Sequence, residues 1–363
     1  MEPLSVGVIG CGTISDAYFE GDAVHDAFDV VACADIDQDA REAKAAEYNV
    51  DAYTTEELLE TDVEAVVNLT PPTVHADVCV SALEAGKHVY TEKPLAATTE
   101  GADRMRAAAA ENDRLLGSAP DTFLGAGIQT ARKALDDGAI GEPVGATAAW
   151  TSPGHEVWHP QPDLYYQAGG GPLFDMGPYY LSALVFLLGP ANRVSGSVTR
   201  AKDTRTIGSG PRAGEEIDVE VPTHEVGTAD FGDGVVADLL FSFDAPASTL
   251  PMPAFEIYGT EGTLALPDPN HFSGPVRVKG TGDEEWTEIE SEGYTAGRGA
   301  GVADLAFAVR GEWEHRTNGE LAGHVLDILE GVRESSERGE HVPLDGEFER
   351  PAVLPDSFPA SPF

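Results

Sequence analysis

The chain of 363 residues is 42% hydrophobic, which is enough for two domains with separate cores and too apolar for an intrinsically disordered protein. Its 63 acidic and 22 basic residues give a formal net charge of -41, and the carboxylates are spread along the whole sequence. Because nucleic-acid binding needs clustered lysines and arginines and no basic run is present, this charge argues against a nucleic-acid partner.

The N-terminal third alternates apolar, β-type runs with segments of helical periodicity. The runs cover residues 4–10, 28–36, 64–70 and 86–92. Continuous apolar strands separated by amphipathic helices are typical of a parallel sheet with helices on both faces. We therefore predict an α/β protein whose residues 1–120 form a Rossmann-type, doubly wound parallel sheet covered by helices.

The pattern changes after this domain. Helices are predicted at 127–137, in the stretch "GGGPLFDMGPYY" (169–180), and at 319–339. Alternating segments rich in valine, threonine and phenylalanine, joined by Asp-Gly and Glu-Gly turns, predict a large, mainly antiparallel open sheet. We expect residues 121–345 to form an α+β domain, followed by an extended tail over 346–363.

The stretch "GVIGCGTIS" carries the first chemical signal. Gly10, Gly12 and Ser15 occupy the positions of a G-x-G-x-x-G/A fingerprint, and Thr13 and Ile14 complete the loop. The pattern provides a tight turn, a bare backbone where a diphosphate approaches, and a small residue for close helix–strand packing. Because it follows a strand and opens a helix, we predict a dinucleotide at the helix N-terminus.

Asp35 ends the second predicted strand, about 20 residues beyond the fingerprint, where an acidic side chain accepts hydrogen bonds from the ribose hydroxyls. Its charge would repel a 2′-phosphate, so we expect NAD as the cofactor and consider NADP less suitable. Arg41 leaves the preference for NAD open, since it could face a 2′-phosphate. Alternatively, it is an ordinary surface charge on a helix.

The segments "NLTPPTVHADV" and "YTEKPLA", together with the glycine motif and the "GGGPLFDMG" helix start, resemble the glucose-fructose oxidoreductase / inositol dehydrogenase (Gfo/Idh/MocA) family. The resemblance spans nearly the whole chain. It implies that Thr70, Pro71 and His75 border the cofactor, that Glu92 touches the nicotinamide ribose, and that Lys93 points into the active site. It also implies a homo-oligomer, a dimer or tetramer.

Lys93 would also attract attention from chemistry alone. An ammonium group at the carboxyl edge of a parallel sheet lies where ligands bind in such folds. Burial beside a cationic nicotinamide would lower its pKa and prepare it to exchange a proton with a substrate hydroxyl. The alternative is a surface lysine. The resemblance also implies a peptide bond before Pro94 that is often cis. For His75, a simple hydrogen bond to the backbone is an equal alternative to contact with the cofactor.

Asp175 and Tyr179 are four residues apart and share one face of a helix. Because a proline is tolerated only in the first turn, Pro178 predicts that this helix begins near Asp175. In the family the position of Tyr179 is commonly histidine. The resemblance therefore makes Tyr179 the acid/base, with Lys93 stabilising its phenolate and Asp175 orienting the substrate. The alternatives are an Asp175 that caps the helix, a Tyr179 in the core, and Tyr180 in its place.

Further substrate contacts are predicted more weakly. Flat aromatic rings suit the C–H faces of sugars, which points to the side chains in "HEVWHPQPDLYYQ", although aromatic residues are usually core. Gln129 lies where the family often has a polar contact, but its surroundings depart from the common form, and Asp121 and Thr122 share that doubt. No role is assigned to His155 or His159. The aromatic candidates are Trp158, Tyr165 and Tyr166.

Taken together, these features predict an NAD-dependent oxidoreductase that acts on a sugar, sugar derivative or polyol. One alternative is an NAD-dependent glycoside hydrolase of the same family, which oxidises its substrate transiently to permit elimination. Another is a non-catalytic sensor that binds a dinucleotide and a partner protein; loss of the lysine in the E-K-P motif would indicate it, and Lys93 is present.

The remaining composition describes the environment of the protein. Cys11, Cys33 and Cys79 show neither disulfide nor metal-ligand spacing, so no metal is expected. With no signal peptide and no apolar run near the ~20 residues that span a bilayer, we expect a cytoplasmic protein with no membrane partner. Molar salt shortens the Debye length to about 3 Å and screens a highly acidic surface, so we interpret the charge as that of a salt-in halophile. An acidic tail that binds a basic protein is the alternative.

Overall fold

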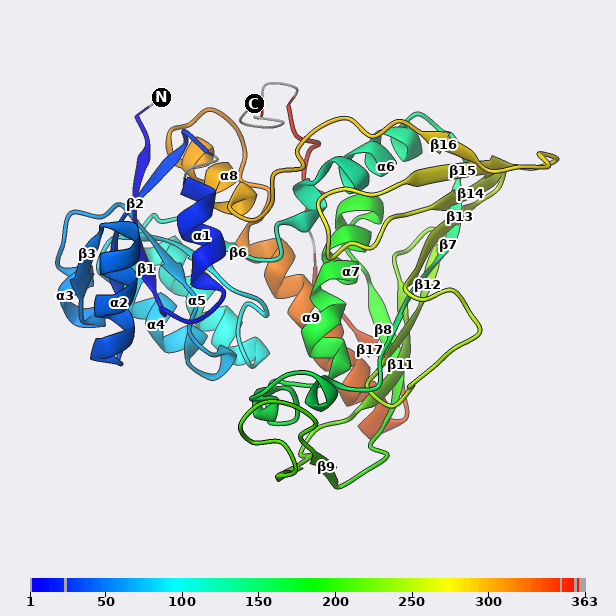
Figure 1. Cartoon of the computed structure of the whole chain (residues 1–363). Coiled ribbons are helices and arrows are strands. Elements are labelled where there is room, and N and C mark those ends of the chain that lie inside the picture. Colours follow the sequence, from blue (N-terminus) through cyan, green and yellow to red (C-terminus); the bar gives the residue numbers. More distant parts are fainter. Residues whose placement is uncertain (1, 23–24, 347, 356–357, 359–363) are drawn as a thin grey trace. The chain divides into compact units, whose positions relative to one another are not determined.

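A computed structural model describes residues 2–22, 25–346, 348–355 and 358. The chain forms two compact units (Figure 1), the first comprising Met1–Gly125, Gly293–Gly323 and Pro351–Phe363, and the second Ala126–Glu292 and His324–Arg350. The predicted second domain covered 121–345, and of these residues Gly293–Gly323 belong to the first unit. The predicted tail over 346–363 lies partly outside the described residues. Each unit is described by itself.

The first unit contains a six-stranded parallel sheet in the order β3-β2-β1-β4-β5-β6. The order reverses between β1 and β4, as in a doubly wound fold, so the predicted Rossmann architecture is confirmed. The short outer strands β3 and β6 and the helix α5 were not predicted. The strands are β1 (Leu4–Ile9), β2 (Phe28–Ala34), β3 (Asp51–Tyr53), β4 (Ala65–Asn68), β5 (His88–Thr91) and β6 (Leu116–Ser118), and the connecting helices are α1 (Ser15–Asp22), α2 (Gln38–Tyr48), α3 (Thr55–Leu59), α4 (His75–Glu84) and α5 (Thr99–Glu111).

Helix α8 (Ala300–Val309) also belongs to the first unit, although it comes late in the sequence. The fully buried Asp121 accepts hydrogen bonds through Oδ2 from the amides of Gly299 and Gly301, at 3.1 and 3.0 Å. Burial raises the pKa of Asp121, and the nearby Arg298 guanidinium opposes that rise. Asp121 therefore holds the start of α8 in place, which gives it a structural role within the unit.

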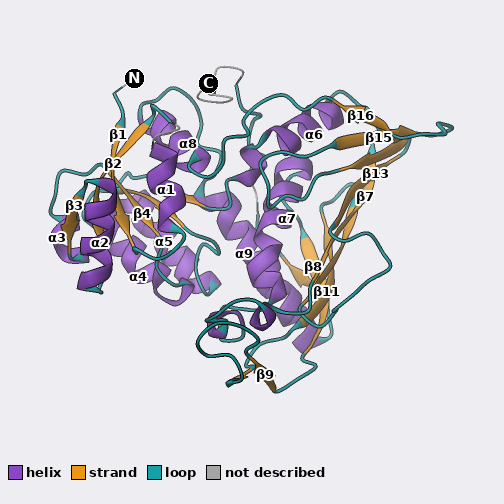
Figure 2. Ribbon diagram, in the orientation of Figure 1, coloured by secondary structure: helices purple, strands orange, loops and turns teal. Residues whose placement is uncertain are grey.

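The second unit contains a nine-stranded sheet in the order β16-β15-β14-β13-β7-β12-β11-β8-β17, and Figure 2 shows α6 and α7 on one face of it. The neighbours are antiparallel except for β7 and β12, so the predicted mainly antiparallel sheet is confirmed. The elements are α6 (Ala126–Asp136), β7 (Pro143–Thr151), α7 (Pro172–Leu188), β8 (Arg193–Thr199), β11 (His224–Asp230), β12 (Val236–Ser242), β13 (Ala254–Gly259), β14 (Gly262–Ala265), β15 (Val276–Gly280), β16 (Thr287–Ile289), α9 (Gly319–Arg338) and β17 (Val342–Pro343); β9 (Thr204–Thr206) and β10 (Glu216–Asp218) form a separate small hairpin.

The start of α7 differs from the prediction. The helix begins at Pro172, so Pro178 lies at its seventh position instead of in its first turn. A proline there removes one intrahelical hydrogen bond, a local cost that the surrounding packing offsets, because every residue from Pro172 to Leu187 except Asp175 is buried. The prediction near Asp175 was wrong because it weighed the local proline rule without this burial. Asp175 and Tyr179 are nevertheless both helical.

Candidate active site

The two glycines of the loop after β1 have different surroundings. Gly10 has φ +103°, and a Cβ there would lie 2.9 Å from the carbonyl carbon of Leu69, so the backbones are too close for any side chain. A Cβ at Gly12 would meet nothing within 4 Å. The fold therefore requires the first glycine, whereas the second keeps clear the space above the loop.

The loop closes onto the first turn of α1. Ser15 is buried, and both its amide and its Oγ donate to the carbonyl of Gly12, at 3.0 and 2.7 Å. Residues 12–14 are exposed. Exposed backbone at a helix N-terminus, with a bare face at Gly12, fits the diphosphate of a dinucleotide.

Asp35, directly after β2, lies beside this loop. Its Oδ2 accepts a hydrogen bond from the amide of Cys11 at 2.8 Å, and its Oδ1 accepts one from the amide of Asp37 at 2.9 Å. Arg41 donates to the backbone carbonyl of Asp35 at 3.0 Å. Asp35, which is predicted to favour NAD, and Arg41, which could face a 2′-phosphate, therefore contact each other.

The loops after β4 and β5 are linked by buried polar side chains. Asn68 accepts from the Oγ1 of Thr70 at 2.8 Å and donates to the Oγ1 of Thr91 at 3.0 Å. The ring of His75 is fully buried between the carbonyls of Thr70 (2.8 Å from Nε2) and Pro94 (2.9 Å from Nδ1), and burial lowers its pKa. His75 thus connects the two loops; contact with a cofactor stays a prediction.

The E-K-P segment follows β5. Glu92 accepts through Oε1 from the hydroxyl of Tyr18 at 2.8 Å and through Oε2 from the amide of Lys93 at 3.1 Å. The Lys93–Pro94 bond is cis, as the resemblance implied, and Lys93 is half-buried. The structure therefore brings the predicted cofactor residues of the first unit to the carboxyl edge of one sheet, at the ends of β1, β2, β4 and β5.

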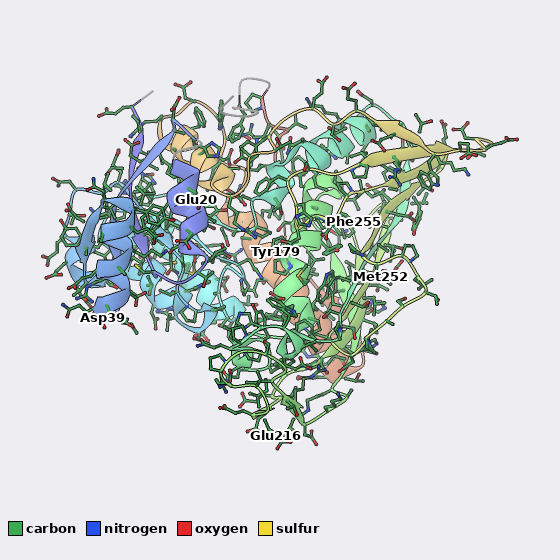
Figure 3. All side chains as sticks on the ribbon, in the orientation of Figure 1. Glu20, Asp39, Tyr179, Glu216, Met252 and Phe255 are labelled. Atoms are coloured by element: carbon green, nitrogen blue, oxygen red, sulfur yellow. The ribbon has the colours of Figure 1, made fainter. Side chains whose placement is uncertain are left out.

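In the second unit, Tyr179 and Tyr180 are adjacent in α7 but point in different directions. Tyr180 is fully buried, with its ring 5.4 and 5.3 Å from those of Phe241 and Phe255 on the sheet. Figure 3 labels Tyr179 on α7 and Phe255 on β13. Tyr180 therefore belongs to the packing against the sheet, and Tyr179 stays the candidate that shares a helix face with Asp175.

Asp175 does not cap its helix. The cap position is Gly171, and the free amide of Leu173 donates at 3.0 Å to Glu225, which Arg333 pairs at 2.7 Å. The alternative of a capping Asp175 is therefore excluded. Asp175 is also the one residue of Pro172–Leu187 that is only partly buried.

The glycines before α7 serve the protein itself. A Cβ at Gly170 would lie 2.5 Å from the carbonyl oxygen of Leu164, and one at Gly171 would lie 2.5 Å from the guanidinium of Arg333. The close approach thus occurs within the protein, and it requires these two glycines for packing.

His155, to which the sequence assigned no role, is the partner of Asp175. Its Nε2 lies 2.7 Å from Oδ2 of the carboxylate, and both side chains are almost buried. The pairing joins α7 to a loop 20 residues earlier. The only signal in the sequence is a histidine in the loop before the helix that carries the carboxylate, which is too common a pattern to identify the pair.

The aromatic candidates around this loop differ in exposure. Trp158 is 59% exposed and Tyr165 is half-buried, so both keep their predicted role. Tyr166 is fully buried and donates to Glu156, which gives it a structural function. Gln129 is buried in α6. Its contact with substrate stays a prediction.

Two classes of site find no support in the described part of the chain. Among those residues, no group of three or more His, Cys, Asp or Glu side chains could hold a metal ion. None of the helices described combines the length and the apolar character needed to cross a membrane.

Comparison with known proteins matches both units to one family. Residues 4–119 match the model of an oxidoreductase family with an NAD-binding Rossmann fold, and residues 128–265 match the GFO/IDH/MocA C-terminal domain. The 1,5-anhydro-D-fructose reductase of Ensifer adhaerens is 31% identical over 71% of this chain and 74% of its own length. The chain belongs to the Gfo/Idh/MocA oxidoreductase family.

Other Gfo/Idh/MocA relatives extend the comparison. The dTDP-3,4-didehydro-2,6-dideoxy-alpha-D-glucose 3-reductase of Saccharopolyspora spinosa is 31% identical over 78% of this chain and 82% of its own. A levoglucosan dehydrogenase solved with NADH and L-sorbose has the same fold, with a TM-score of 0.81 at 20% identity, over 94% of this chain and 99% of that chain. The family identity thus covers both the cofactor unit and the unit that carries Asp175.

Proposed function

We propose that the protein is a nicotinamide-dependent oxidoreductase that acts on the hydroxyl-bearing or carbonyl carbon of a sugar, sugar derivative or polyol, and that it prefers NAD to NADP. The bound nicotinamide would accept or supply the hydride. The observation that carries the proposal is the carboxyl edge of the first sheet, where the open face of Gly12, the Asp35 carboxylate and the Glu92-Lys93-Pro94 turn come together. The names of the relatives, reductases and dehydrogenases of sugars, support the substrate class.

The residues of the chain would divide the work of the reaction. Gly10 and Gly12 with the start of α1 would hold the diphosphate, and Asp35 would accept from the ribose hydroxyls. Lys93 would take the hydroxyl proton during oxidation and return it during reduction. Tyr179 would act as a second proton carrier, on the face of α7 that it shares with Asp175.

The direct test is a screen of sugars, polyols and keto-sugars in molar salt, with NADH formed or consumed as the signal and the phosphorylated cofactor tested in parallel. Turnover of one of these substrates supports the proposal. Cleavage of a glycoside without net formation of NADH would instead identify a glycoside hydrolase. Binding of the dinucleotide without turnover of any substrate class would identify a sensor.

Replacing Asp35 with asparagine should raise the relative kcat/KM for NADP over NAD by about tenfold, because the repulsion of a 2′-phosphate is removed while the side-chain oxygen can still accept from the amide of Cys11. Steady-state kinetics with both cofactors measures the ratio. Asp37→Asn is the matched control, since Asp37 caps α2 two residues away, and it should leave the ratio unchanged. An unchanged ratio in Asp35→Asn would show that Asp35 does not select the cofactor.

Replacing Tyr179 with phenylalanine should lower kcat by about a hundredfold while KM changes little, because the ring is kept and only the proton carrier is lost. Tyr180→Phe is the control, because that ring packs against the sheet beside Phe241 and Phe255. It should retain the activity of the parent protein. Equal activity in both variants would remove Tyr179 from the proton transfer.

A further inference from the structure

We propose that His155 is a positioning residue of the active site, which donates a hydrogen bond from Nε2 to Asp175 and so fixes the orientation in which that carboxylate meets a substrate hydroxyl. This inference rests on the proposed function, since it assumes that Asp175 faces a sugar or polyol. It adds a residue from outside α7 to the predicted pair of Asp175 and Tyr179.

The contact itself has the geometry of a strong hydrogen bond. Nε2 of His155 and Oδ2 of Asp175 are 2.7 Å apart, and the two side chains are 9% and 13% exposed. A hydrogen bond to a carboxylate is shorter and roughly twice as strong as a neutral one, and exclusion of water strengthens it further. An aspartate side chain with such a donor keeps one rotamer, whereas one without it is freer to rotate.

The backbone of His155 is held at both ends. Its amide donates to the hydroxyl of Tyr166 at 3.1 Å, and its carbonyl accepts from the amides of Trp158 and His159 at 3.2 and 2.8 Å. Its ring is enclosed by aromatic rings, with centroids 4.3 Å from Tyr165 and 4.8 Å from Phe243. The donor is therefore preorganised, which is what a positioning role requires.

The loop is anchored to the sheet by a buried charge network. Arg205 pairs with Glu156, the residue after His155, at 2.7 Å, and it also pairs with Asp244. Arg205 is 2% exposed in its side chain. Glu156 is thus held by Arg205, and the carboxylate that the His155 ring contacts is that of Asp175.

The second ring nitrogen of His155 identifies the tautomer. Nδ1 is buried and has no hydrogen-bond partner among the described residues. A proton on Nδ1 would be a buried donor without an acceptor, which is costly, so the structure assigns the ring proton to Nε2. In this tautomer His155 donates to Asp175 through Nε2.

Three variants separate donation from packing. His155→Phe keeps an aromatic ring but removes the donor, and His155→Gln places an amide N–H near the position of Nε2. His159→Phe is the matched control from the same loop. We expect His155→Phe to lower kcat/KM by about tenfold to a hundredfold, mostly through kcat, His155→Gln to recover most of that loss, and His159→Phe to resemble the parent protein. Melting temperatures measured alongside identify a variant that fails to fold.

Full activity in His155→Phe would overturn the proposal, and so would a His155→Gln variant that folds and is as slow as His155→Phe. A measurement that does not depend on turnover distinguishes failure of the His155 proposal from failure of the proposed oxidoreductase function. In nitrogen-15 NMR of histidine-labelled protein, the His155 signal, identified by its absence in His155→Gln, should show a proton on Nε2 that moves upfield in Asp175→Asn. A His155 without that proton contradicts the proposal whether or not a sugar is turned over, while the expected spectrum in a protein that oxidises no sugar would mean that the proposed function has failed.

Discussion

Replacing Lys93 with alanine should lower kcat by about 10²- to 10⁴-fold, the range that a positioned general acid/base usually contributes. Lys93 is half-buried at the carboxyl end of β5, and its amide is bound by the carboxylate of Glu92. Because this contact uses the backbone and not the ammonium group, the turn and its cofactor contacts should persist in the variant. NAD affinity, measured by fluorescence titration, should therefore stay within a few-fold of the parent protein.

Lys87→Ala provides the control for Lys93→Ala. Lys87 precedes the same strand at the opposite edge of the sheet, where its ammonium group donates to the carbonyl of Thr61 at 2.6 Å. It should keep full turnover. If Lys93→Ala turned over at a rate close to that of Lys87→Ala, the proton would have to be carried by another group, with Tyr179 first to be tested.

The second large effect concerns the glycine loop. Gly10→Ala should destabilise the first unit, because φ +103° strains any side-chain-bearing residue and the new Cβ would lie 2.9 Å from the carbonyl of Leu69. Strain of this kind costs about 1–3 kcal/mol before the steric overlap is added. Thermal unfolding should show a melting temperature lower by several degrees.

Gly12→Ala should behave in the opposite way. Its Cβ meets no atom of the protein within 4 Å, so the melting temperature without ligand should change little. The methyl group would instead occupy the space into which the diphosphate is expected to fit, and NAD affinity should fall by tenfold or more. Unimpaired NAD binding in Gly12→Ala would place the diphosphate elsewhere.

The first unit was the more predictable because its signals are local. The turn at Gly10, the start of α1 at Ser15 and the carboxylate of Asp35 follow from a contiguous motif and a fixed spacing, and the structure confirms the parallel sheet that orders them. The structure adds a hydrogen bond from the amide of Cys11, within the motif, to the carboxylate of Asp35. The role of Asp121 was not predictable, because its partner amides lie on a helix that the sequence analysis did not identify.

The candidate site of the second unit depends on tertiary structure and was less predictable. A helix that carries Asp175 and Tyr179 was predicted, yet its start was misplaced because burial outweighed the local preference of Pro178. The pairing of His155 with Asp175 requires a loop whose shape depends on Arg205, which is 49 residues beyond the Glu156 that it anchors. No rule of periodicity or spacing in the sequence predicts such a contact.

The late return of the chain to the first unit has a consequence for the order of events during synthesis. Asp121 is made long before the amides that bind it, which follow 178 and 180 residues later. Throughout that interval the ribosome is producing the strands of the other unit, while the nascent Rossmann sheet still lacks α8. The cofactor unit, although first in sequence, can therefore reach its native state only after most of the chain has been synthesised, and cutting the gene after codon 125 would yield an incomplete fold instead of a free-standing domain.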